Sequence, residues 1–217
     1  MIHVYGVVDE LGELPAIHGV EDAPLRRRRV GELELVVSEV AGDAEVTQDA
    51  VLRHAQVVEE LMACSSAVLP AQFGRPFGGD DELTAAVAAK STELARGLSR
   101  VRGCVEFGLR AVGLVATPVV HDSSGTGYMR ARLEDERRRE QLVSAVHEPL
   151  ARLSRATAPA SASAGGVFEC VYLVPVADVE AFRDAVSRVE PASPELTLVC
   201  TGPWPPYSFG TSGEDTA

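Results

Sequence analysis

The residues best suited to bind phosphate lie in one glycine-rich stretch, from Gly74 to Gly79. Glycine-rich loops that precede a helix can bind phosphate through backbone N–H groups. This stretch lacks the Lys-Ser/Thr ending of a P-loop, and the acids Asp80, Asp81 and Glu82 follow it. These carboxylates would repel phosphate, whereas acids in a first helical turn suit the positive end of the helix dipole. We therefore interpret the stretch as a turn that enters a capped helix.

The histidines and cysteines form no pattern typical of catalysis or of a metal site. None of the five histidines stands at ligand spacing from another, and we expect His54 on the polar flank of a helix as a surface or hydrogen-bonded residue. The cysteines are far apart in apolar segments, which favours reduced core residues over zinc ligands. They are Cys64, Cys104, Cys170 and Cys200. Signatures of metalloproteases, serine hydrolases and P-loop enzymes are missing, so we expect no catalytic residue, metal or cofactor.

Length and composition indicate an ordinary globular protein with two small domains. The chain has 217 residues, of which 46% are hydrophobic and 24% charged. Its formal net charge of -12 disfavours nucleic acid and anionic membranes as partners. No apolar run is long enough to span a bilayer, and Met1–Gly6 resembles a first strand rather than a signal peptide. The basic run Arg26–Arg29 is interpreted as a solvated loop, with docking to an acidic partner as the alternative.

Hydrophobic periodicity predicts an α+β domain in the first half of the chain. Strands are expected over residues 2–8, 33–38 and 67–73, and a strand at 105–111 then begins the second half. Pro70 cannot donate to a ladder, so the third of these should be interrupted or lie at a sheet edge. Thr47 should cap a helix whose buried stripe is Val51, Leu52, Ala55, Val58 and Met62. A second helix, residues 83–101, should end near Gly103.

The second half predicts a modified ferredoxin-like domain with a prominent helix. That helix should run over residues 128–156, kinked or divided by Pro149, with its charged half exposed. A Pro/Ala/Ser/Gly linker follows at 158–166. A strand at 168–174, a helix capped by Asp178 and a strand at 196–200 complete the pattern, one strand short of the usual number. We divide the chain into domains at 1–102 and 103–209, each with helices on one face of a sheet, and a disordered tail at 210–217.

The segment before that tail, Thr201–Phe209, combines three prolines with three aromatic residues. The prolines stiffen an extended path and should end the preceding strand at Gly202. Large aromatic rings are usually at least partly buried, so packing is favoured over an interaction surface. We predict that Trp204, the only tryptophan, packs on the second domain, with Phe209 nearer the exit to disorder.

The same segment, Thr-Gly-Pro-Trp-Pro-Pro-Tyr-Ser-Phe, resembles the terminal signature of the gas vesicle F/L family (GvpF/GvpL). Collinear matches are Val4–Val8, similar to the opening Tyr-Gly strand, and Val68–Gly74, similar to Leu-Pro-x-Arg-Phe-Gly with Gln72 where Arg is common. Val105–Arg110 resembles a Val-Glu-Trp/Phe-Gly-x-Lys/Arg strand, and Phe168–Val174 a Tyr-Leu-Val strand. Residues of these motifs are the candidate interaction residues: Phe73, Gly74, Glu106, Gly202, Pro203, Trp204, Pro205, Pro206, Tyr207 and Phe209.

The resemblance implies a non-enzymatic accessory or minor structural protein of cytoplasmic gas vesicles. It implies binding to the main hydrophobic shell subunit (GvpA type) and to other accessory proteins, in support of nucleation or assembly. No cofactor, nucleic acid or lipid membrane is implied. The alternatives are a small-molecule-binding or sensory α+β domain, which would need an apolar pocket with convergent polar groups, and, third, an enzyme.

Overall fold

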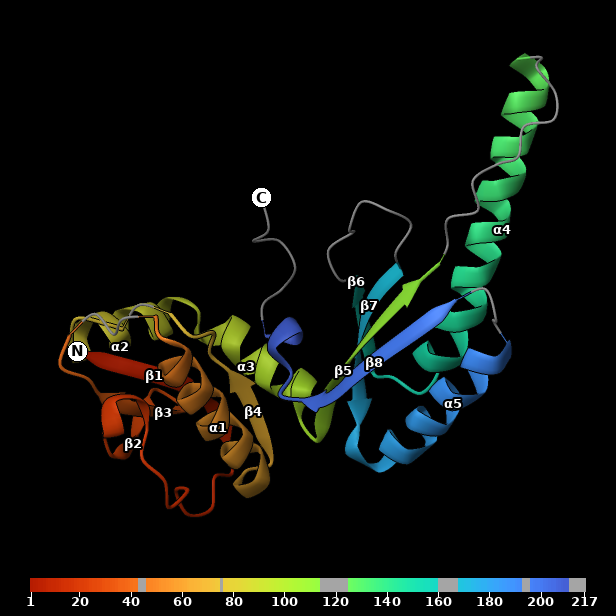
Figure 1. Ribbon diagram of the computed structural model, residues 1–217. Coiled ribbons are helices and arrows are strands. Elements are labelled where there is room, and N and C mark those ends of the chain that lie inside the picture. The colour runs from red at the N-terminus through yellow and green to blue at the C-terminus, as the bar shows by residue number, and fades with distance from the viewer. Residues whose placement is uncertain (43–45, 75, 114–124, 160–167, 193–195, 211–217) are drawn as a thin grey trace. The chain divides into compact units, whose positions relative to one another are not determined.

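The computed structural model describes residues 1–42, 46–74, 76–113, 125–159, 168–192 and 196–210 (Figure 1). The chain divides into two compact units. The first comprises Met1–Glu106 together with the residues from Pro203 onward, and the second comprises Phe107–Gly202. The sequence-based division at residue 102 had assigned the segment after Gly202 to the second domain. In the structure that segment groups with the first unit.

The first unit contains a four-stranded sheet in the order β2-β3-β1-β4, with antiparallel pairing throughout. Its strands are β1 (Ile2–Asp9), β2 (Leu25–Val30), β3 (Leu33–Glu39) and β4 (Ala67–Pro70). The pairing of β1 with β3 shifts register between Val4 and Gly6, which marks a bulge. The bulge puts Tyr5 and Val8 in the same core cluster although they are three residues apart. Pro70 ends β4 at a sheet edge, as predicted.

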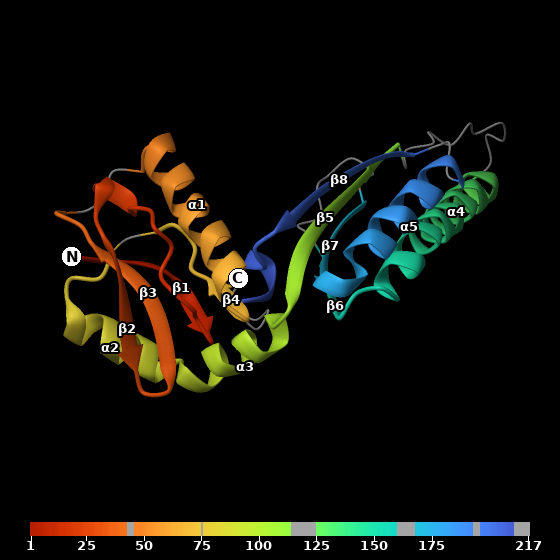
Figure 2. The ribbon, with the colours of Figure 1, turned by 90° about the horizontal axis from the view of Figure 1, so that it is seen from below.

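Three helices cover the two faces of this sheet, as Figure 2 shows. Helix α1 (Gln48–Cys64) lies on one face, and helices α2 (Asp80–Ala89) and α3 (Ser91–Val101) lie on the other. Coverage of both faces corrects the prediction of helices on one face. Lys90, with φ −109° and ψ 12°, separates α2 from α3, so the single helix predicted over 83–101 was wrong. Thr47 caps α1 by accepting a hydrogen bond from the backbone N–H of Ala50, as predicted.

The buried stripe of α1 differs from the predicted one. Val51 and Leu52 are exposed, and the helix instead buries His54, Val57, Val58 and Leu61. The Arg26–Arg29 run also differs, because it lies in edge strand β2 rather than in a loop. Its arginines lie beside carboxylates of neighbouring elements: Arg27 is 3.5 Å from Glu34, and Arg28 is 3.1 Å from Asp80. Charged side chains of this kind are a common protection for a sheet edge.

The second unit has a ferredoxin-like sheet in the order β6-β7-β5-β8. Its strands are β5 (Cys104–Val112), β6 (Ala156–Pro159), β7 (Phe168–Pro175) and β8 (Thr197–Trp204). Strand β6, which pairs with β7 in antiparallel fashion, is the strand that the prediction lacked. It occupies positions that were assigned to the end of a helix and the start of a linker. The rest of that linker, and the predicted disordered tail after Gly210, lie outside the described residues.

Helices α4 (Gly125–Ala151) and α5 (Val179–Ala192) both contact β7 and each other. Phe107, Tyr172 and Phe182 form the aromatic centre of this core, with ring centroids 4.9 and 5.4 Å apart. The charged half of α4 is exposed at Arg137–Glu140, as predicted. Helix α4 is not divided at Pro149, which lies in its last turn, but ends at Ala151 rather than 156. No described helix is long and apolar enough to cross a membrane.

Candidate functional site

The terminal signature is attached to the first unit by a buried carboxylate. Glu106 is 8% exposed, and its Oε2 accepts a 2.8 Å hydrogen bond from the backbone N–H of Ser208. Its Oε1 accepts a second bond, of 2.9 Å, from the Ser208 hydroxyl. Burial raises the pKa of Glu106, and the two bonds from Ser208 oppose that shift. Glu106, a candidate from the family motif, therefore holds residues 203–210, the terminal segment, in place.

The rings of the terminal segment differ in burial. Pro205, Pro206 and Phe209 are buried, and Tyr207 is half-buried against the core of the first unit. Burial, with a smaller effect of Glu59, raises the pKa of Tyr207 to about 12. Trp204, in contrast, remains 48% exposed.

The prediction that Trp204 packs on the second domain was therefore wrong, and the disorder predicted beyond Phe209 lies outside the described residues. Phe209 is 4% exposed and anchors the segment, whereas Trp204 belongs to edge strand β8 and faces solvent over about half its surface. The strand also continues beyond Gly202 through Pro203. An edge strand tolerates a proline because one side of its ladder needs no donor. Gly202 has φ +118°, a conformation that favours glycine.

A groove of about 730 Å³ in the first unit brings together two of the candidate motifs. Gly74, from the segment after β4, and Tyr207 and Gly210, from the terminal segment, line it. Most of the other lining residues are apolar and come from β1, β4, α2 and α3. The terminal segment approaches α3 so closely that a Cβ placed on Gly97 would lie 3.1 Å from the Gly210 carbonyl oxygen. Gly97 thus permits this close contact.

Phe73 belongs to a different cluster, in the core beneath α1. Its ring centroid lies 5.4 Å from that of His3 and 5.7 Å from that of His54. His54 is 2% exposed, so its predicted place on a polar flank was wrong. Its Nδ1 lies 2.9 Å from His3 Nε2, and its Nε2 lies 2.9 Å from the Ala71 carbonyl oxygen. Burial lowers the pKa of His54 and, with the charge on His54, lowers that of His3 to about 4.

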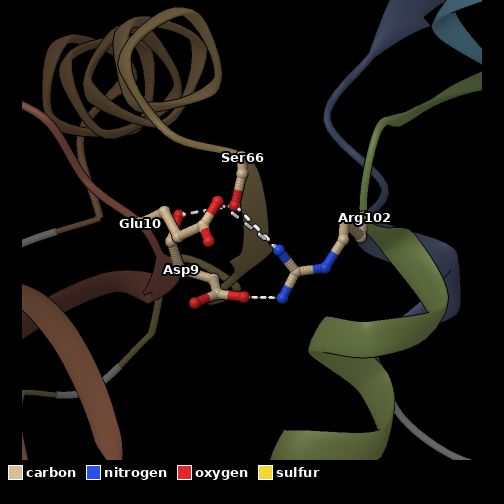
Figure 3. Close-up of polar contacts among 4 residues, drawn as sticks. All are labelled: Asp9, Glu10, Ser66 and Arg102. Carbon is tan, nitrogen blue, oxygen red and sulfur yellow. Dashed lines mark hydrogen bonds and ion pairs between the residues drawn. The ribbon is translucent and has the colours of Figure 1, made fainter.

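A third polar group fixes the end of α3, as Figure 3 shows. Arg102 Nη1 donates a 3.1 Å hydrogen bond to the Ser66 hydroxyl, and Nη2 pairs with the Asp9 carboxylate. The backbone N–H of Gly103 donates to the Ser66 carbonyl at 3.3 Å. These bonds tie the chain to the adjoining ends of β1 and β4 just before it enters β5. Sequence reasoning missed this group because its members are far apart in the chain.

The cysteines and acidic residues do not form a metal site in the part of the chain that the structure describes. Cys104 and Cys170 are buried, as predicted. Cys64 is only partly buried and Cys200 is exposed, so the prediction of core cysteines was wrong for Cys200. Asp80, Asp81 and Glu82 form the first turn of α2, and Glu82 accepts a 2.7 Å hydrogen bond from the Gly78 backbone N–H. The predicted turn into a helix is confirmed, whereas the N-cap residue, Gly79, makes no side-chain capping hydrogen bond.

Comparison with known proteins identifies the family of this architecture. Residues 1–211 match the family model described as gas vesicle synthesis protein GvpL/GvpF. The chain belongs to the GvpL/GvpF family. Membership implies a role in gas vesicle formation and association with other gas vesicle proteins. It confirms the resemblance that the terminal signature and the collinear motifs indicated.

Individual relatives match this chain in sequence or in structure over nearly its whole length. Gas vesicle protein F1 of Halobacterium salinarum is 27% identical, over 96% of this chain and 92% of its own length. Gas vesicle protein L of a Streptomyces species is 28% identical, over 98% of this chain and 94% of its own length. The crystal structure of GvpF from Microcystis aeruginosa matches with a TM-score of 0.77 at 15% identity, covering 97% of this chain and 99% of that one. GvpF from an Anabaena species matches with a TM-score of 0.79 at 16% identity, covering 98% of each chain. These structures support the two-domain α+β fold.

Proposed function

We propose that this protein binds the main hydrophobic shell subunit of gas vesicles in the cytoplasm and supports nucleation or assembly of the shell, without catalysing a reaction. A self-assembling apolar subunit needs a partner that covers its exposed surface until it joins the shell. Other accessory gas vesicle proteins are expected as further partners. The family to which the chain belongs supports this proposal, and so does the geometry of the terminal segment.

The main structural support for this proposal is the exposed ring of Trp204 on a stiff, anchored segment. One exposed aromatic ring is common on any protein. This ring, however, lies between Pro203 and Pro205 on a segment that Glu106 and Phe209 anchor to the first unit. An indole on a stiff backbone loses little conformational entropy on binding, and tryptophan is among the residues that contribute most at protein interfaces. Trp204 therefore suits a contact with an apolar partner.

Retention of the purified shell subunit by immobilised protein tests this function. We expect the wild-type chain to retain it and Trp204→Ala to bind at least about tenfold more weakly. Tyr128→Ala is the matched control, because Tyr128 is an equally exposed aromatic residue, at 47%, in α4. A wild-type chain that fails to retain the shell subunit would contradict the proposal. Equal losses in both variants would exclude a specific role for Trp204.

A further inference from the structure

The four outer strands of the two sheets differ in how their free edges are protected. Edge strands normally carry charges, prolines or very few residues, which prevents pairing with another chain. Strand β2 has four consecutive arginines, whereas β4 and β6 have only four residues each and both end in proline. Strand β8 has eight residues, Thr-Leu-Val-Cys-Thr-Gly-Pro-Trp, and none is charged. Its only proline, Pro203, is near its C-terminal end.

Strand β8 is also largely exposed. Six of its eight residues are exposed, and Val199 retains 47% of its accessible surface. Strand β5 pairs with one side of β8, and no strand among the described residues pairs with the other (Figure 1). From Thr197 to Thr201 the backbone can offer hydrogen bonds along that free side. Gly202, with φ +118°, and Pro203, which lacks an N–H, limit the pairing site to this stretch.

We propose that the free edge of β8 over Thr197–Thr201 pairs with an extended strand of the main shell subunit. The proposal rests on the function proposed above and specifies where and how the subunit binds. Five residues at about 3.3 Å each give an edge of roughly 16 Å, the length of an ordinary strand. Main-chain hydrogen bonds would provide the attachment, and exposed side chains such as Val199 would contact apolar side chains of the incoming strand.

The charge of the chain argues for this partner rather than for a second copy of the protein. Two copies would each bring a formal net charge of -12 into one complex, and their mutual repulsion opposes pairing. A predominantly apolar subunit meets no such repulsion. Because β8 carries no charged residue, pairing with the subunit also requires no ionic group of this strand to lose its hydration.

A charge at the edge tests the proposal against a matched control in the same sheet. Val199→Lys puts on β8 the kind of residue that protects natural edges. Val112→Lys makes the same change at a comparably exposed valine, 40%, at the end of the inner strand β5. We expect Val199→Lys to bind the purified shell subunit at least about tenfold more weakly, and Val112→Lys to bind within about twofold of wild type.

Amide hydrogen exchange of the wild-type chain gives an independent readout. Adding the shell subunit should slow exchange within Thr197–Thr201. Wild-type affinity in Val199→Lys, or unchanged exchange in this stretch at saturating shell subunit, would overturn the edge proposal and leave the proposed function standing. A wild-type chain that does not bind the shell subunit would overturn both. Slower exchange that depends only on the concentration of the chain itself would identify a second copy as the occupant and overturn the proposal.

Discussion

Phe209→Ala should destabilise the first unit strongly, because this ring anchors the terminal segment. Phe209 is 4% exposed and lies in the short 3-10 helix η3 (Tyr207–Phe209), which contacts α3. Deleting a buried phenylalanine side chain typically costs about 3–5 kcal/mol, since transfer and cavity terms add. A domain of this size shifts its melting midpoint by roughly 4 °C per kcal/mol. We therefore expect a midpoint lower by about 10–20 °C.

Two further variants separate anchoring from simple loss of an aromatic ring. Phe209→Leu keeps most of the apolar volume and should cost less than about 1.5 kcal/mol. Trp204→Ala removes a ring that is 48% exposed, so it should cost at most about half as much as Phe209→Ala. Thermal and urea unfolding followed by circular dichroism measure all three. A cost below about 1 kcal/mol for Phe209→Ala, or a larger cost for Trp204→Ala, would refute the assignment of Phe209 as the anchor.

Two further predictions concern the first unit. Replacing glycine by alanine stabilises an ordinary exposed helix by up to about 1 kcal/mol. Gly97→Ala should instead destabilise α3, because the new Cβ would lie 3.1 Å from the Gly210 carbonyl oxygen and the backbone there would have to move. Urea unfolding gives the sign of the change, and a stabilised variant would show that the contact with Gly210 does not require glycine at position 97. Between pH 6.5 and about 4 the unfolded chain binds a proton at His3 that the folded chain does not. Lowering the pH through this range should therefore reduce the free energy of unfolding by roughly 3 kcal/mol. The same urea titration of His3→Phe should be less steep, and an equal slope would exclude His3 as the cause.

The sequence predicted the elements whose patterns are strong locally. Strands β1, β3, β5 and β7 and helix α5 follow from clear alternation or helical spacing, and the terminal signature pointed to the family. Strand β6 was missed because Ala-Thr-Ala-Pro lacks the apolar alternation of a strand, and it forms only by pairing with β7. Strand β2 was missed because four arginines resemble a loop unless carboxylates from β3 and α2 lie beside them.

The candidate site was predictable in its residues but not in their roles. The motifs identified Glu106, Trp204 and Phe209, yet which ring is buried depends on how the terminal segment meets the first unit. That depends on Ser208, 102 residues after Glu106, and on the absence of a side chain at Gly97. His54 was misplaced because its burial beside His3 requires a partner 51 residues away. Contacts at such separations leave no periodic signal in a single sequence.

The most direct test of shell-subunit binding uses the fact that Trp204 is the only tryptophan. The chain can be produced with 5-fluorotryptophan, so that its ¹⁹F NMR spectrum contains one resonance from the proposed contact. Adding unlabelled, purified shell subunit should shift or broaden this resonance and reduce its dependence on H₂O or D₂O as solvent, because the half-exposed indole becomes covered. A resonance that keeps its position, width and solvent dependence at saturating shell subunit would contradict direct contact through Trp204.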